Sequence, residues 1–243
     1  MHDDGYFNES VAAHYDDDEK FGSEFVDPTA DFLAKLAGPG SALELGVGTG
    51  RIALPLARRG VPVHGIDLSK AMVAKLEEKP GASDVAVTIG DFASTVVEGK
   101  FSLVYLVYNT IINLTEQEAQ VACFRNAARH LEPGGCFVIE VFVPRLRQVP
   151  SGEANHAYDI SESHWGIDEY DIATQSLTSH HLSMIDGEPC RSSTPFRYVW
   201  PAELDLMAQL AGLQLNERWG GWNREPFTSD CDSHVSVWRK PVA

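Results

Sequence analysis

Residues 41–50 read SALELGVGTG, a short apolar run that ends in three glycines at alternate positions. Such a run is typical of a buried strand, and glycine permits tight turns and a close approach of the backbone to a ligand. A helix is expected over residues 52–59, so its N-terminus points at the same turn. The stretch therefore predicts a strand, a glycine turn and a helix that together bind a nucleotide-like molecule.

Strand and helix patterns continue to alternate after this stretch. Helices are expected over residues 69–78 and 115–130, because Ser69 and Thr115 are suitable N-caps and Glu118 completes a capping box with Thr115. Strands that alternate with helices predict an α/β fold, with a doubly wound, mostly parallel sheet and helices on both faces. The further strands are expected over residues 61–66, 85–90, 101–108 and 136–143.

Residues 145–200 interrupt this rhythm. Asp186-Gly187 predicts a hairpin turn between two strands. We expect an antiparallel β insertion that forms a cap over the ligand-binding edge of the sheet, with strand patterns near residues 158–165, 167–176, 179–185 and 191–200. After it, a helix over 201–211 and two antiparallel strands would complete a seven-stranded Rossmann-like sheet; these strands are expected over 213–219 and 234–239.

The 243 residues suit a single domain. A short helix is expected near residues 10–15, and Asp27-Pro28 is expected to open a second helix. The predicted parts of the domain, in chain order, are an N-terminal lid with helices over 1–40, a cofactor-binding core over 41–144, the cap over 145–200, and a final helix and β-hairpin over 201–243.

The composition bounds the partners of the chain. It carries 19 Lys and Arg against 35 Asp and Glu, a net charge of −16. So acidic a surface repels phosphate backbones and anionic lipid, so we expect no nucleic acid or membrane partner and favour a neutral or cationic small molecule. The acidic start of the chain is unlike a signal peptide, and the four cysteines form neither a CxxC pair nor a disulfide framework. We expect a cytoplasmic protein that is a monomer or a homodimer.

Three carboxylates lie at the ends of the expected strands: Glu44, Asp67 and Asp91. The carboxyl ends of parallel strands share one edge of a sheet, and open α/β sheets bind ligands there. Dinucleotide sites use GxGxxG, whereas Arg51 stands at the sixth position here, and a charge on Glu44 would repel a pyrophosphate. An acidic turn of this kind favours a ligand with an amino group or a sulfonium.

Four motifs in this order resemble those of the class I S-adenosylmethionine-dependent methyltransferases of the small-molecule type. The resemblance covers roughly residues 10–143. It implies S-adenosyl-L-methionine as cofactor, S-adenosyl-L-homocysteine as product, and methyl transfer to an oxygen or a nitrogen, or to a carbon, of a small molecule by in-line displacement. The motifs are residues 44–50, Gly65-Ile66-Asp67-Leu68-Ser69, Gly90-Asp91-Phe92 and Leu131-Glu132-Pro133-Gly134-Gly135.

The resemblance also implies a set of cofactor contacts. The glycines would pack against the methionine part, Asp67 would bind the ribose hydroxyls, and Asp91 would accept from the adenine amine. Tyr15 belongs to a Tyr-Asp segment that folds over the cofactor in many members, although an exposed terminal helix explains it equally. In chain order, the candidate cofactor residues are Tyr15, Glu44, Gly46, Gly48, Gly50, Asp67, Leu68, Met72, Asp91, Phe92, Val107 and Tyr108.

Candidates for contact with the methyl acceptor lie after the fourth strand and in the cap. Asn109 and Asn113 could orient a substrate, but relatives that act on sugar amines tend to carry a histidine near position 113, which disfavours a sugar amine here. Aromatic side chains could enclose the acceptor and an arginine could clamp a carboxylate. The candidates for these roles are Trp165, Trp222, Arg197 and Arg224.

In-line displacement needs no dedicated base, so the catalytic residues are unknown from the sequence. Candidates are Tyr15, His164 and His181. His180 and His181 alternate across an expected strand, so at most one of them faces a given pocket. The fourth strand lacks the acidic cluster of magnesium-dependent members, and we expect no metal.

Two other functions stay open. An NAD(P)-dependent Rossmann oxidoreductase would use the same strand order, but Arg51 and Glu44 disfavour it. A non-catalytic nucleoside-binding module would use the same pocket without transferring a methyl group. Binding of S-adenosylhomocysteine rather than NAD separates the first alternative, and transfer of a labelled methyl group separates the second.

Overall fold

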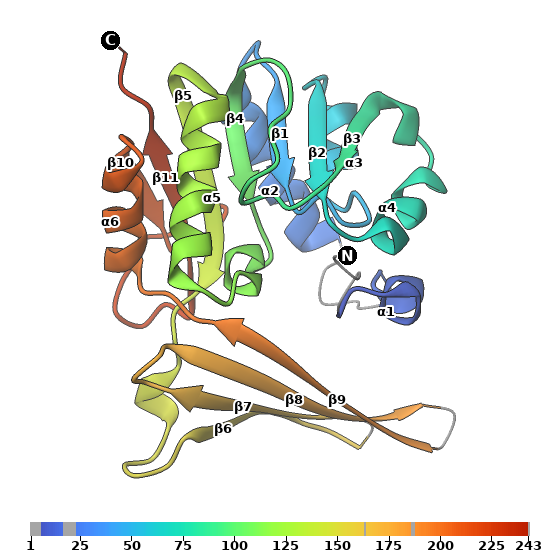
Figure 1. Cartoon of the computed structure of the whole chain (residues 1–243), viewed down its shortest axis with the longest axis vertical. Coiled ribbons are helices and arrows are strands. Elements are labelled where there is room, and N and C mark those ends of the chain that lie inside the picture. The colour runs from blue at the N-terminus through green and yellow to red at the C-terminus, as the bar shows by residue number, and fades with distance from the viewer. Residues whose placement is uncertain (1–5, 17–22, 163, 186–187, 243) are drawn as a thin grey trace.

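The computed structural model describes residues 6–16, 23–162, 164–185 and 188–242. Seven strands form the main sheet in the order β10-β11-β5-β4-β1-β2-β3 (Figure 1). β1 to β5 pair in parallel, whereas β11 runs antiparallel to both β5 and β10. The doubly wound, mostly parallel, Rossmann-like sheet is therefore confirmed. Its strands are β1 Ala42–Leu45, β2 Val63–Asp67, β3 Val85–Ile89, β4 Phe101–Leu106, β5 Leu131–Phe142, β10 Gln214–Trp219 and β11 Ser233–Arg239.

The central strands of this sheet are buried on both faces, as their near-continuous apolar sequences require. Successive side chains of a strand point to opposite faces, so Leu103 and Val104 of β4 belong to different cores. One core contains residues of α2 (Ser23–Ala37), α3 (Ala53–Arg58) and α4 (Lys70–Glu77). The other contains residues of α5 (Gln117–His130) and α6 (Pro201–Leu210). Helices thus cover both faces.

The start of α2 differs from the sequence prediction. The helix begins at Ser23 rather than at Asp27, so Pro28 lies in its second turn. Proline at this sixth helical position lacks the N–H that would bond the carbonyl of Glu24, so the helix forgoes one hydrogen bond here. The hydroxyl of the following Thr29 donates to the carbonyl of Phe25 (2.8 Å) and adds a hydrogen bond to this turn.

Two further boundaries differ near α5. The helix begins at Gln117 with Glu116 as its N-cap and has no side-chain cap, so the capping box expected at Thr115 does not form. β5 begins at Leu131, before the Pro-Gly-Gly segment expected to precede it. Pairing with the end of the chain extends the strand, because the Gly134 N–H donates to the carbonyl of Lys240 (2.9 Å).

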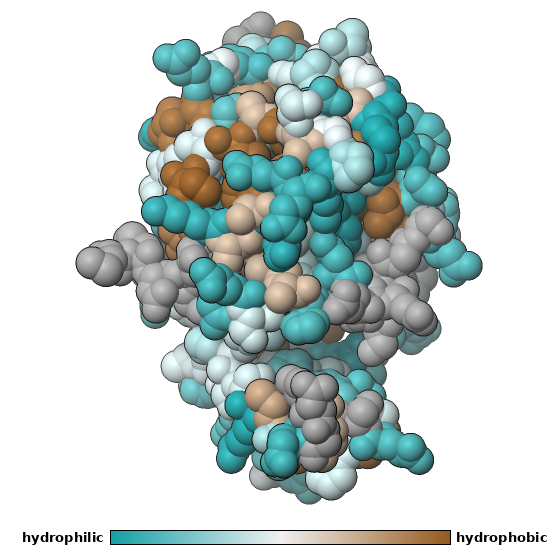
Figure 2. Space-filling view, turned by 90° about the vertical axis from the view of Figure 1, so that its right-hand side faces the viewer, coloured by the Kyte–Doolittle hydropathy of each residue, from teal (hydrophilic) through white to brown (hydrophobic). Residues whose placement is uncertain are grey.

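The insertion after β5 forms a second sheet, antiparallel and four-stranded, in the order β6-β7-β8-β9. It lies below the main sheet in Figure 1, and Figure 2 shows it as a smaller lobe set off by a constriction. A bend near Ser161 divides the strand expected over 158–165, and the turn expected at Asp186-Gly187 lies outside the described residues. The strands are β6 Asn155–Ile160, β7 His164–Asp171, β8 Ser176–Ile185 and β9 Glu188–Arg197.

A short helix, α1 (Glu9–His14), precedes the core, close to the prediction for residues 10–15. Asn8 caps it by accepting from the N–H groups of Ser10 and Val11. Of all helices in the described ranges, none combines the length and the apolar character needed to cross a membrane.

We expect Phe124→Ala to lower the free energy of unfolding by about 3–5 kcal/mol, because it would leave a cavity beside the rings of Phe137 and Trp238. Urea unfolding followed by circular dichroism measures the change. Leu206→Ala on α6 is the control: this side chain is 60% exposed, and its loss should change the free energy of unfolding by less than about 0.5 kcal/mol. Equal effects of the two substitutions would contradict the assignment of Phe124 to the core.

Candidate active site

The glycine turn after β1 has a backbone that glycine adopts without strain. Gly46, Gly48 and Gly50 have φ angles of 79°, 54° and 75°. A Cβ atom on Gly46 would lie 2.6 Å from the side chain of Thr110, and one on Gly50 would lie 2.9 Å from Leu76. Larger residues at these positions would therefore be strained and would also clash.

Asp67, the last residue of β2, ties this turn to the next helix. Its Oδ2 accepts from the N–H of Gly48 (2.6 Å), and its Oδ1 accepts from the N–H of Ser69 (2.8 Å). The Ser69 hydroxyl accepts in turn from the N–H of Met72 (3.1 Å) and caps α4, as the sequence predicts. Each carboxylate oxygen retains acceptor capacity for a ligand.

Glu44 lies behind the turn, in the protein interior. Its Oε2 accepts from the hydroxyl of Tyr105 (2.8 Å), and the N–H of Ala53 also donates to the carboxyl. Burial raises the pKa of Glu44 to about 8. The sequence argument that a charge on Glu44 repels pyrophosphate does not hold, because at neutral pH this carboxyl is mostly protonated. Its position suits a role in holding the loop.

A cavity of about 370 Å³ opens beside the turn, at the carboxyl ends of β1 and β2. We call it the cofactor cleft. It brings together eight of the twelve candidate cofactor residues, which are Tyr15, Gly46, Gly48, Asp67, Leu68, Met72, Asp91 and Phe92. A smaller hollow behind the turn is lined by Glu44, Val107 and Tyr108. Gly50 does not line the cleft but belongs to the same turn, two residues after Gly48.

The N-terminal segment closes one side of the cofactor cleft. The guanidinium of Arg51 lies between two tyrosine rings, 4.7 Å from the centre of Tyr15 and 5.0 Å from that of Tyr108. Asp16 accepts from the hydroxyl of Thr49 (2.9 Å) and pairs with Lys79 (2.6 Å). Tyr15 therefore lies against the glycine turn, which agrees with the lid position that the resemblance implies.

The end of β4 carries two consecutive residues in the left-handed region, Tyr108 (φ 56°) and Asn109 (φ 59°). The carboxylate of Glu140 accepts from the N–H of Tyr108 (2.7 Å), and Asn109 Oδ1 accepts from the N–H of Phe142 (2.7 Å). Burial raises the pKa of Glu140 to about 7. The Asn109 side-chain oxygen thus holds this turn in place.

A second cavity of about 450 Å³ lies between the main sheet and the cap. We call it the acceptor chamber. Phe7 and Asn113 line both this chamber and the cofactor cleft, so the two cavities adjoin. The sequence did not single out several of its polar residues, namely Arg145, Tyr158, Asp168 and Ser179. For Tyr158, Asp168 and Ser179 the available signal was alternation within the cap strands, which identifies one face but not what that face covers.

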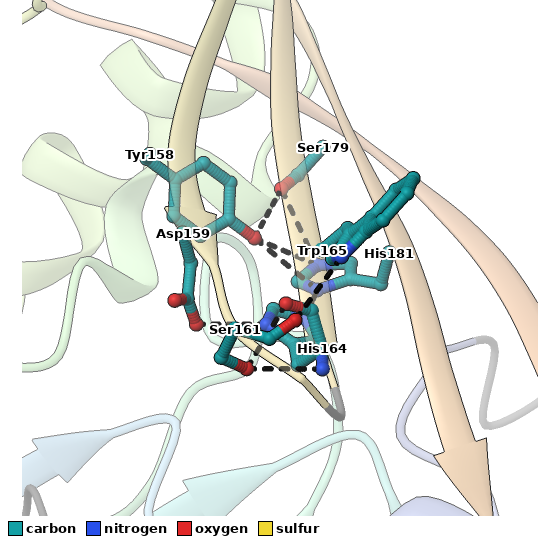
Figure 3. Close-up of polar contacts among 7 residues, drawn as sticks. All are labelled: Tyr158, Asp159, Ser161, His164, Trp165, Ser179 and His181. Atoms are coloured by element: carbon teal, nitrogen blue, oxygen red, sulfur yellow. Dashed lines mark hydrogen bonds and ion pairs between the residues drawn. The ribbon is translucent and has the colours of Figure 1, made fainter.

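Five polar residues of the cap form a connected group, which we call the cap cluster: Tyr158, Asp159, His164, Ser179 and His181 (Figure 3). Asp159 Oδ2 lies 2.8 Å from His164 Nδ1, and His164 Nε2 lies 3.0 Å from His181 Nδ1. His181 Nε2 lies 3.3 Å from the hydroxyl of Ser179, and the Tyr158 hydroxyl lies 3.2 Å from His181 Nδ1 and 3.4 Å from its Nε2. The structure thus joins two candidate histidines that the sequence treats separately.

Four other candidates lie apart from both cavities. Trp165 is 54% exposed on the cap face opposite His164. Arg197 is buried between α5 and α6, where it pairs with Glu203 (2.8 Å). Trp222 packs against Phe32 in the core. The guanidinium of Arg224 lies over the rings of Phe32 and Trp219. None of these four side chains lines either cavity: Arg197, Trp222 and Arg224 pack or pair elsewhere, and Trp165 is exposed on the other face of the cap.

Comparison with known proteins identifies the family. A family model described as a methyltransferase domain matches residues 42–135. The solved CcbJ methyltransferase from Streptomyces caelestis is 35% identical, with a TM-score of 0.87 and coverage of 99% of this chain and 100% of that chain. This chain belongs to the class I S-adenosylmethionine-dependent methyltransferases. Its cofactor is S-adenosylmethionine, and S-adenosylhomocysteine is the product.

Other relatives of this methyltransferase are more distant. The cypemycin N-terminal methyltransferase of a Streptomyces species is 28% identical over 239 residues, which are 94% of this chain and 95% of the relative. The solved CalS10 amino pentose methyltransferase of Micromonospora echinaspora is 19% identical with a TM-score of 0.69, over 99% of this chain and 100% of that chain. The latter similarity shows a shared fold.

We expect Asp67→Ala to weaken the binding of S-adenosylhomocysteine by about 1–3 kcal/mol, because it removes a carboxylate from the cleft and leaves the Gly48 N–H unpaired. Isothermal titration calorimetry measures the loss, and circular dichroism checks the fold. Asp84→Ala, an exposed change near the end of α4, is the control and should bind as the unchanged protein does. Unchanged affinity in folded Asp67→Ala would remove Asp67 from the site.

Glu44 predicts a pH dependence of stability. Its pKa is about 8 in the folded protein against an ordinary value of 4.5, so between these limits the folded state holds a proton that the unfolded state has lost. The free energy of unfolding therefore falls as pH rises, by up to about 1.4 kcal/mol per pH unit. Glu44→Gln should flatten this fall between about pH 5 and 8 in urea titrations. The exposed Glu78→Gln should keep it, and an unchanged slope in Glu44→Gln would refute the assignment.

Proposed function

We propose that this methyltransferase transfers a methyl group to a nitrogen of a small-molecule amine. The observation that carries the proposal is the junction of the cofactor cleft with the acceptor chamber at Phe7 and Asn113. Methyl transfer requires a nucleophile in line with the bond to the departing sulfur, and much of the rate comes from holding the two in that geometry. Adjoining cavities, each with its own lining, provide such an arrangement.

In this proposal different residues of the cofactor cleft bind different parts of the cofactor. Asp67 accepts from the ribose hydroxyls and Asp91 from the adenine amine, while Leu68, Met72 and Phe92 pack around the base. Three observations support the fit. Gly48 has no side chain between its backbone and Met72 across the cleft. Hydrogen bonds fix both carboxylates: the N–H groups of Gly48 and Ser69 donate to Asp67, and the N–H of Ala93 donates to Asp91 (2.8 Å). When bound, the cofactor supplies a methyl group on a positively charged sulfur.

The acceptor chamber suits an amine for two reasons. Asp168 faces it from β7, and burial raises the pKa of this carboxyl despite nearby Arg145 and His156, so a cationic or hydrogen-bonding partner would stabilise its charged form. The net charge of −16 also attracts cations. The name of the relative that acts on the N-terminus of cypemycin supports nitrogen as the acceptor atom.

Asn113 and Tyr108 would orient the acceptor, because both line the chamber and Asn113 also lines the cofactor cleft. The Asn113 amide donates to the Thr110 carbonyl (3.1 Å), which fixes the side chain and leaves its carbonyl oxygen for a substrate N–H. Phe7 closes the junction on the side of the N-terminal segment and excludes water from the reacting atoms.

The two alternative functions are an NAD(P)-dependent oxidoreductase and a non-catalytic nucleoside-binding module. Membership of the methyltransferase family excludes the function of an NAD(P)-dependent oxidoreductase. The non-catalytic module differs from the proposal only in the transfer step. A second ligand chamber beside the cofactor cleft favours transfer, because binding a nucleoside alone requires no such chamber.

The test supplies the protein with S-adenosylmethionine carrying a tritiated methyl group and with three small amines: n-propylamine, L-proline methyl ester and D-glucosamine. Matched alcohols, n-propanol and D-glucose, serve as oxygen acceptors. The proposal expects label on an amine and not on the alcohols. Label on the alcohols alone would overturn nitrogen as the acceptor, and label on none of them would favour the non-catalytic module.

We further expect Asp168→Asn to raise the KM for the amine about tenfold, because an interaction of a charged group worth roughly 1.4 kcal/mol is lost. The affinity for S-adenosylhomocysteine should stay unchanged, since Asp168 lines the acceptor chamber and not the cleft. Asp171→Asn, an exposed change at the end of the same strand, is the control. An unchanged KM in Asp168→Asn would mean that the amine binds elsewhere.

A further inference from the structure

The cap cluster has no part in binding the cofactor, yet three of its members, Tyr158, Ser179 and His181, line the acceptor chamber. Figure 3 shows Tyr158 on β6 and Ser179 and His181 on β8 pointing toward one another, with His164 below them. His181, His164 and Asp159 form a chain of hydrogen bonds that leads away from the chamber. Proton transfer requires titratable groups connected in this way.

The hydrogen bonds of the cap cluster set which nitrogens carry protons. A carboxylate only accepts, so Asp159 requires an N–H at His164 Nδ1. Neutral His164 then has its lone pair on Nε2, which requires an N–H at His181 Nδ1, 3.0 Å away. Neutral His181 is left with its lone pair on Nε2. That lone pair faces the hydroxyl of Ser179, which lines the chamber, while the Tyr158 hydroxyl lies beside both ring nitrogens.

We propose that His181 is the general base of the methyl transfer, and that His164 and Asp159 are positioning residues that hold it in the reactive tautomer and conduct its proton away. The inference rests on the proposed function, since an amine bound as an ammonium ion has no lone pair and must lose a proton before it can attack.

The atoms and charges of this step balance. The N–H proton of the acceptor moves to His181 Nε2, the freed nitrogen lone pair forms the bond to the methyl carbon, and the carbon–sulfur bond breaks with its electron pair kept by sulfur. His181 becomes an imidazolium and passes its Nδ1 proton to His164 Nε2. His164 releases its own Nδ1 proton to Asp159. The side chains of Asp159 and His164 are 30% and 27% exposed, so the proton can pass from there to solvent.

The packing around the cluster keeps its members in place. Gly166 of β7 lies under the Tyr158 ring, and a Cβ atom there would come within 2.3 Å of that ring. Glycine at this position therefore lets the Tyr158 hydroxyl reach His181. Burial lowers the pKa of His181, and repulsion from His164 and His180 lowers it further, which keeps the imidazole neutral at physiological pH. The other titratable groups around it are Tyr158, Asp159, Asp168 and Arg145.

The first test needs no acceptor. Nitrogen-15 NMR of the histidine-labelled full chain, bound to S-adenosylhomocysteine, distinguishes a protonated Nδ1 from a protonated Nε2. We expect His181 to carry its proton on Nδ1. In His164→Leu, which removes the acceptor, His181 should return to a mixture of tautomers. His181 with its proton on Nε2 in the unchanged protein would overturn the relay.

The second test measures kcat against pH with the amine that accepts label best. We expect His181→Gln to lower kcat by about 10²- to 10⁴-fold with unchanged affinity for S-adenosylhomocysteine. His164→Leu should lower kcat, because it removes the acceptor that holds His181 in the reactive tautomer. His164→Gln, which keeps an acceptor near the Nε2 position, should restore part of the rate.

His180→Gln is the matched control, because His180 lies on the other side of β8, bonded to Ser193 (2.8 Å) and near Glu169 (3.2 Å). It should keep kcat within about twofold, as for a surface substitution. Wild-type kcat in His181→Gln would overturn His181 as the base and leave the proposed function intact. Absence of label on every amine with the unchanged protein would instead overturn the proposed function, and the base assignment with it.

Discussion

The carboxylate of Asp67 is the contact on which the cofactor cleft depends. One of its oxygens binds the Gly48 N–H of the turn after β1, and the other binds the Ser69 N–H at the start of α4. Two loops from neighbouring strands are thereby held at a fixed spacing. The glycines make this possible, because their positive φ angles allow the tight turn in which the Gly48 N–H meets the carboxylate. The N-terminal segment depends on the same spacing, since Ser69 also donates to the carbonyl of Phe7 (2.6 Å) and Thr49 donates to Asp16.

The two sheets line different cavities of the protein. The main sheet supplies the cofactor cleft from the ends of its parallel strands, where the turn after β1 meets Asp67 of β2 and Asp91 after β3. The cap supplies most of the polar groups of the acceptor chamber from one face of a separate antiparallel sheet. Because the cap comes from one continuous segment after β5, residues on its inner face can change without disturbing the hydrogen bonds around Asp67.

Sequence reasoning predicted the main sheet well, because buried parallel strands are apolar throughout and the glycine turn has few alternative conformations. It also placed eight cofactor candidates around one cleft, since the ends of parallel strands meet at one edge. It failed where tertiary contacts decide: Arg197 pairs with Glu203 on α6, and Trp222 fills the core beside Phe32. The link between His164 and His181 depends on the register of β7 and β8, which no local pattern specifies.

The position of Phe7 bears on both ligands at once. Its ring belongs to the wall of the cofactor cleft and to that of the acceptor chamber. The Phe7 ring is therefore a wall that the two cavities share. Any change of this side chain alters the shape of both cavities together, so the size of residue 7 constrains the nucleoside and the acceptor jointly.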